Sequence, residues 1–137
     1  MSTQAIYEKR GAPITFVNTG GDKLINLKSL AQVTGRLSAF YDRGANAAPD
    51  EYEVRAYCQW ESTVSANETM QIFLCQSDGT HTDAGLTYHD DGDAAVTLAE
   101  CSNLKPIGQV NASSAAAQEF GATFLVRITS RYFAIAI

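Results

Sequence analysis

Two long stretches of strict alternation constrain the fold of this chain, because a period of two along a sequence marks a half-buried strand. Apolar residues occupy every second position across 52–60, and the same rhythm returns across 120–128. A shift of one residue would send Glu53 and Arg55 into the core, so the register of the first stretch is strongly specified. We expect this strand to be central, because Tyr52 and Trp60 put large apolar area on one face.

Shorter apolar patterns, separated by turn-forming Gly, Asp and Ser residues, predict the remaining strands. A short alternating strand lies at 70–74, and less regular candidates lie at Pro13–Asn18, Leu24–Leu30, Gln32–Tyr41, Val96–Glu100, Pro106–Asn111 and Tyr132–Ile137. Only Ala112–Glu119 could form a short helical turn. Eight or nine short strands with long polar loops predict an all-β fold, namely an antiparallel β-sandwich of jelly-roll type.

The length of 137 residues fits one domain, which we divide into an N-terminal arm at 1–11 and a β-sandwich domain at 12–137. A composition of 45% hydrophobic and 18% charged residues is that of a globular protein. The longest apolar run is too short to span a membrane, and the first residues lack the apolar core of a secretory signal. We expect a soluble protein made in a cytoplasm.

Charge is unevenly distributed along the chain. Residues 1–60 carry seven basic and six acidic side chains, whereas residues 61–137 carry three basic and nine acidic ones. Between Arg55 and Lys105 there is no basic residue, and eight acidic residues lie there. Such a surface repels phosphate backbones, so we expect no nucleic-acid partner.

The stretch 75–93 is the richest in chemical groups, with five aspartates and both histidines of the chain. Its Gly79 does not occupy the sixth position that an EF-hand calcium loop requires. His81 and His89 could bind a transition metal, but a spacing of eight positions through a loop preorganises nothing. We expect Ser77–Asp93 to be a solvent-exposed connection, rich in turn formers and without bound metal.

Other signatures of chemistry are missing from the sequence. The three cysteines, Cys58, Cys75 and Cys101, form no C-x-x-C pair, which favours free buried thiols over disulfides or a zinc site. There is no G-x-S-x-G nucleophile motif and no phosphate-binding loop, and Glu61 and Glu68 flank what reads as an ordinary turn. We expect no catalytic, cofactor-binding or metal-binding residues, and no enzymatic activity.

Several segments read together form a recognisable pattern. They are Gly35-Arg36, Tyr41-Asp42-Arg43-Gly44, the alternating 52–60 strand, the Ser77-Asp78-Gly79-Thr80 turn and Arg131-Tyr132. This pattern resembles that of small virion proteins of tailed bacteriophages, the capsid decoration or cement proteins. The resemblance implies a jelly-roll-like homo-oligomer that binds the major capsid protein on the outside of the virion and stiffens the shell.

The charge distribution suggests which part of the chain would touch a capsid. If the acidic connection faces solvent, the less negative N-terminal third is left to face the shell. We therefore expect capsid contact through Lys9, Arg10, Lys23 and Lys28, where charged groups would orient docking more than supply affinity. Deletion of residues 1–11 is expected to abolish head binding and to leave the β-rich circular dichroism intact.

The apolar segment near residue 137 predicts a second contact. An uncovered apolar strand is an aggregation hazard, so Phe133, Ile135 and Ile137 should be buried, either centrally in one sheet or against a neighbouring subunit. The resembled proteins continue into at least one more strand, which makes a second copy a natural cover. We expect an oligomer interface there in a dimer or trimer, and aggregation when residues 133–137 are removed.

The alternative function is a phage tail or head-fibre module that recognises a host receptor or carbohydrate, because jelly rolls also serve as lectins. Its aromatic platform would come from Tyr7, Tyr41, Tyr57 or Tyr88. Co-sedimentation with phage heads, as opposed to host cells or polysaccharide, separates the two functions.

Overall fold

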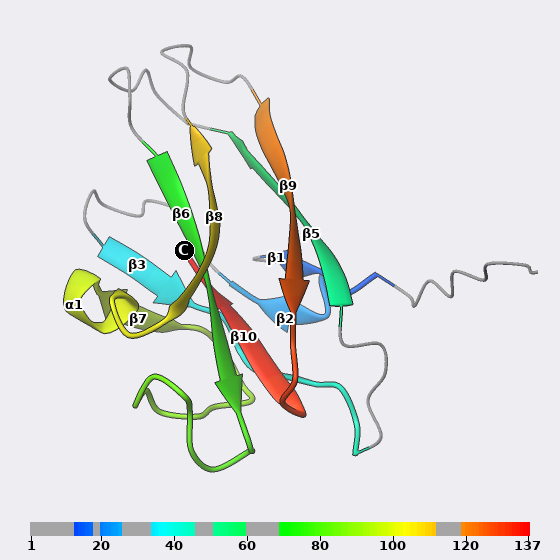
Figure 1. Ribbon diagram of the computed structural model, residues 1–137, viewed down its shortest axis with the longest axis vertical. Coiled ribbons are helices and arrows are strands. Elements are labelled where there is room, and N and C mark those ends of the chain that lie inside the picture. The colour runs from blue at the N-terminus through cyan, green and yellow to red at the C-terminus, as the bar shows by residue number, and fades with distance from the viewer. Residues whose placement is uncertain (1–12, 18–19, 26–33, 46–50, 60–68, 112–118) are drawn as a thin grey trace, which may run out of the picture.

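The computed structural model describes residues 13–17, 20–25, 34–45, 51–59, 69–111 and 119–137 (Figure 1). Within these ranges the chain forms ten strands and one short helix. The strands are β1 (Phe16–Val17), β2 (Lys23–Leu24), β3 (Thr34–Leu37), β4 (Tyr41–Asp42), β5 (Glu51–Gln59), β6 (Thr69–Ser77), β7 (Ala94–Thr97), β8 (Lys105–Asn111), β9 (Glu119–Arg127) and β10 (Tyr132–Ala136), and the helix is α1 (Leu98–Cys101). The all-β prediction is confirmed, and the jelly-roll topology stays a prediction.

The main sheet has six strands, with β10 at its centre. Its order is β7-β3-β10-β6-β8, and β4 also pairs with β10. On one side β10 pairs antiparallel with β6, from Tyr132 opposite Ser77 to Ala136 opposite Phe73. On the other side it pairs antiparallel with β4 and β3. The short β1–β2 pair is parallel and lies apart from this sheet.

The two strands with the strictest alternation form a separate layer. β5 and β9 pair antiparallel over nine residues, from Glu51 opposite Arg127 to Gln59 opposite Glu119. This layer packs against β8, which contacts both β9 and β5, and it lies to the right of β8 in Figure 1. Within the described part of the chain β5 hydrogen-bonds only to β9, so the prediction that β5 is central is wrong. Alternation specifies that one face is buried, and it says nothing about the number of neighbouring strands.

One core fills the space between the two layers. The inward residues of β6 and β10 are almost fully buried there, with Leu74 at 0% and Phe133 at 3% exposure. The Phe124 ring of β9 lies against Gly108 of β8, where an added Cβ would be 2.2 Å from Cε1 of the ring. The buried members of this core are Met70, Ile72, Leu74, Val110, Val126, Ile128, Phe133 and Ile135. The layers therefore pack face to face as in a β-sandwich.

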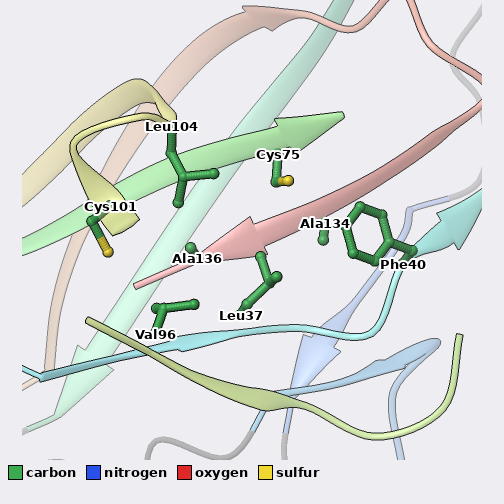
Figure 2. Packing of buried hydrophobic residues seen from close by; sticks show 8 residues of the cluster. All are labelled: Leu37, Phe40, Cys75, Val96, Cys101, Leu104, Ala134 and Ala136. Carbon is green, nitrogen blue, oxygen red and sulfur yellow. The ribbon is translucent and has the colours of Figure 1, made fainter. Parts of the chain in front are cut away.

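A second core lies on the opposite face of the main sheet (Figure 2). Its buried members are Leu37, Phe40, Cys75, Val96, Cys101, Leu104, Ala134 and Ala136. The 78–93 connection adds Ala84, Leu86 and Tyr88 to its edge. Because β10 is covered on both faces, its residues are apolar at nearly every position, as is typical of such strands.

The predicted strand Val96–Glu100 is wrong beyond Thr97. A helix begins there because Thr97 and Glu100 form a capping box. The Thr97 hydroxyl accepts a hydrogen bond from the Glu100 amide at 3.2 Å, and the Glu100 carboxylate accepts one from the Thr97 amide at 2.7 Å. Each group satisfies a backbone N–H that the first helical turn leaves unpaired.

Candidate interaction surface

Two segments of the pattern described above, Tyr41-Asp42-Arg43-Gly44 and Arg131-Tyr132, lie side by side where β4 pairs with β10. Asp42 pairs with Arg131 through two hydrogen bonds of 2.7 and 2.8 Å. Arg131 and the Gly44 amide, which both donate to the Asp42 carboxylate, lower the pKa of Asp42 to about 2. The same carboxylate raises the pKa of Arg131. The Arg131 guanidinium also lies 5.0 Å from the centre of the Tyr132 ring. Nearly half of each paired side chain is exposed, so the pair orients the strand ends and contributes little free energy.

Arg43 clamps the two layers together. Its guanidinium donates to the Tyr52 hydroxyl at 3.0 Å and to the backbone carbonyls of Ile128 and Ser130, each at 2.8 Å. The last two residues belong to the connection between β9 and β10. A planar guanidinium with five donors suits this task, which a lysine could not fill.

Gly35 and Arg36 of β3 contact the end of β10 and the 78–93 connection. A Cβ on Gly35 would lie 2.8 Å from the Ile137 carbonyl oxygen, so only glycine allows β3 and the end of β10 to approach this closely. Arg36 forms an ion pair with Asp93 at 2.8 Å, and that carboxylate is largely buried. The residues of the pattern thus connect neighbouring strands and loops to one another.

Two aspartates of the 78–93 connection accept hydrogen bonds from backbone amides, as turn-forming residues do. Asp78 accepts hydrogen bonds from the amides of Thr80 and His81 at 2.8 and 2.7 Å. Asp83 accepts one from the Gln76 amide at 3.0 Å. In the described residues no three His, Cys, Asp or Glu side chains gather in a way that could hold a metal ion.

The expectation that Ser77–Asp93 is a solvent-exposed connection holds at about half of its positions, and the others are buried or half-buried. Ser77 is buried, and Tyr88 packs against Phe40 with ring centres 5.0 Å apart. The His89 ring meets Phe40 edge-on with ring centres 5.5 Å apart, and both of its nitrogens are enclosed with no hydrogen-bond partner among the described residues. The connection is a cover for the second core because the sheet beneath it has an apolar face on that side.

The cysteine prediction is confirmed for Cys75 and Cys101, which are free and buried. Burial raises the pKa of the Cys75 thiol to about 12 and also raises the pKa of Cys101. The raised pKa values disfavour the thiolate form that a nucleophile or metal ligand needs. The side chain of Cys58 is outside the described part of the chain.

The predicted capsid contacts are only partly located. Lys9, Arg10 and Lys28 lie outside the described residues. The Lys23 ammonium donates to the Asp90 carbonyl at 3.2 Å, across 67 positions of sequence. Lys23 therefore lies beside the acidic connection because folding brings the two together, and its part in capsid contact stays a prediction.

The prediction of an oligomer interface at Phe133 and Ile135 is corrected by their position. They are 3% and 7% exposed within this one chain, and Ile137 is half-buried. The chain's own β6, β4 and β3 pair with β10, and its two cores cover both faces. The alternative of a central strand therefore applies, and the buried side chains of Phe133 and Ile135 are not available to a second subunit.

The outward side of the β5–β9 layer is an exposed, regular surface of the described chain. We call it the outer ladder face, and it consists of Glu51, Glu53, Arg55, Tyr57, Gly121, Thr123, Leu125 and Arg127. Leu125 is 82% and Tyr57 is 65% exposed. Arg55 donates to the Glu53 carboxylate on the same strand. Among the tyrosines considered for a sugar platform, Tyr41 and Tyr88 are half-buried and Tyr7 is outside the described residues.

A small hollow lies elsewhere, on the outward side of β6 and β8. It measures about 210 Å³ and is lined by Gln71, Phe73, Pro106, Gly108 and Gln109. Pockets that enclose small ligands usually measure roughly 300–1,000 Å³. This hollow is smaller than such pockets.

Comparison of the chain with protein-family models, with curated proteins and with solved structures gave no match. In the described residues no helix has the length and hydropathy needed to cross a membrane. Fold and surface together define an antiparallel, sandwich-like all-β protein with two cores and an exposed two-stranded ladder.

Proposed function

We propose that the chain is a structural virion protein that binds the outer surface of a tailed-phage capsid and stabilises it. In this proposal it is a jelly-roll-like decoration protein, it acts as a homo-oligomer, and its partner is the major capsid protein. The observation that carries the proposal is the interlocking of Tyr41–Gly44 with Arg131–Tyr132. These segments are central to the resemblance, and they fasten strands instead of lining a pocket.

A decoration protein needs a rigid body and a surface for docking, and it needs no reacting groups. The clamp made by Arg43 and the two cores favour a rigid body. For the capsid contact we retain the N-terminal arm at 1–11, with Lys9 and Arg10, because charged groups there can steer docking.

The proposal is tested with heads from a phage whose copy of this gene is deleted. Purified full-length protein is added to these heads, and bound protein is quantified after sedimentation. We expect saturable binding to heads, a higher temperature of head disruption, and loss of binding when residues 1–11 are deleted. Wild-type virions that lack the chain by mass spectrometry, or heads that bind none of it, would overturn the proposal.

The carbohydrate-binding alternative has one supporting observation, the exposed ring of Tyr57. Sedimentation with whole host cells or with their polysaccharide tests it in parallel. Binding to cells that is lost in Tyr57→Ala, together with no binding to heads, would favour that function.

A further inference from the structure

One edge of the nine-residue strand β5 has no paired neighbour among the described residues. Within the described residues β5 hydrogen-bonds to β9 on one side only. Its inward side chains Tyr52, Val54 and Ala56 remain partly exposed, whereas Ile72 and Leu74 opposite them are 1% and 0% exposed. A strand placed beside β5 would satisfy its backbone groups and cover this part of the core.

We propose that this strand is β5 of a second copy of the chain, paired antiparallel about Val54. A two-fold axis at Val54 sets Glu53 opposite Arg55 of the second copy, and the reverse pair follows by symmetry. On the inward face, Tyr52 lies opposite Ala56 of the second copy, so a large side chain meets a small one. Opposite charges and matched sizes across a strand pair are stabilising.

The neighbouring registers are less favourable. Pairing about Glu53 or about Arg55 sets two like charges directly opposite each other. Pairing about Tyr52 sets Glu53 opposite Glu51 of the second copy, and pairing about Ala56 leaves Arg55 opposite Tyr57. Like charges directly opposite are destabilising, so charge selects the register about Val54.

The charges of Glu53 and Arg55 favour the pairing of this edge with a second copy. On many exposed edge strands, by contrast, charges prevent such pairing. Natural edges are often guarded by charges of one sign, chiefly lysine. Here Glu53 and Arg55 already form an ion pair within the strand, and the second copy extends that pair into a group of four alternating charges. The result is one four-stranded layer, β9-β5-β5-β9, across the dimer.

The test is the molar mass of the full-length chain and its charge variants, measured by light scattering over a range of concentrations. We expect a concentration-dependent dimer. Glu53→Arg and Arg55→Glu each make the four charges alike, so each variant should weaken the dimer at least about tenfold. An equimolar mixture of the two variants restores opposite charges, so it should regain the dimer as a heterodimer.

Charge-matched controls are Asp91→Arg and Lys105→Glu, which lie on exposed positions away from β5 and should leave the dimer unchanged. Circular dichroism checks that every variant is folded. A monomer at all concentrations, a trimer, or single variants that dimerise like the parent chain would each overturn the proposal. The outcome does not depend on binding to heads, so failure here is distinguishable from failure of the proposed function.

Discussion

Arg43 is the residue whose loss should cost most outside the cores. Arg43→Ala leaves the carbonyls of Ile128 and Ser130 without a side-chain donor, and hydrogen bonds to charged groups make a net contribution of about 1.5–3 kcal/mol each. We expect a loss of roughly 2–4 kcal/mol in the free energy of unfolding, measured by urea denaturation. The control Lys105→Ala removes an exposed cation and should change stability by less than about 0.5 kcal/mol. Equal effects of the two substitutions would show that Arg43 is no clamp.

Asp42 gives the molecule a pH-dependent contact. Its pKa is lowered from 3.8 to about 2 by Arg131 and the Gly44 amide, so its stabilisation is present above pH 4 and is lost as pH falls towards 2. Asp42→Asn removes the charge and keeps an oxygen that can accept from Gly44. We expect the variant to be less stable at pH 7 by under about 1 kcal/mol, since the pair is exposed. Thermal unfolding at pH 7 and pH 2 checks this, and a difference that persists at pH 2 would contradict it.

Among the elements, the contact between β8 and β9 is the tightest joint between the layers. Gly108→Ala would push a methyl group into the Phe124 ring and should cost about 1–3 kcal/mol, as overpacking does in cores. Adding Phe124→Leu to this variant makes room for the methyl group. The double variant should then lose less stability than the sum of the single ones, which chemical denaturation of all four proteins measures. Additive losses would mean that the two residues do not share one site.

The elements that the sequence predicts well are those with a local signal. The alternation across 52–60 and 120–128 was enough for β5 and β9, and the central burial of Phe133 and Ile135 follows from their apolar neighbours. The capping box at Thr97 and Glu100 is also a local signal. The apolar pattern around it nevertheless predicts a strand over Val96–Glu100.

Strand order and the neighbours of charged groups could not be predicted, because they depend on contacts between distant residues. Gln76 shows this: its side-chain carbonyl accepts hydrogen bonds from the amides of Thr129 and Ser130, more than 50 positions away. Lys23 meets Asp90 across 67 positions in the same way. No period in the sequence encodes such pairs.

At the scale of the whole molecule, the main sheet has a cover on each face, and the 78–93 connection is part of one cover. Asp83→Ala removes the carboxylate that holds this connection to Gln76, so local opening over Cys75 should become easier. We expect Cys75 to react with iodoacetamide about fivefold faster, which corresponds to the net value of one hydrogen bond, with no change in oligomeric state. Peptide mapping identifies the modified cysteine.

The control for this measurement is Asp91→Ala, in the same connection and exposed. It should leave the labelling rate of Cys75 unchanged. If both variants label at the rate of the parent chain, Asp83 does not hold the cover in place.

The central position of β10 also has a consequence for synthesis. The strand that joins β6 to β3 and β4 is the last of the described strands to leave the ribosome, so the main sheet cannot close while the preceding residues emerge. Until then β3 and β6 lack the strand that pairs with both of them. Such unpaired apolar strands are prone to aggregate. Because the pairings join distant parts of the chain, folding should also be slow. Nascent chains of this protein would therefore depend on chaperones until residues 132–136 are available.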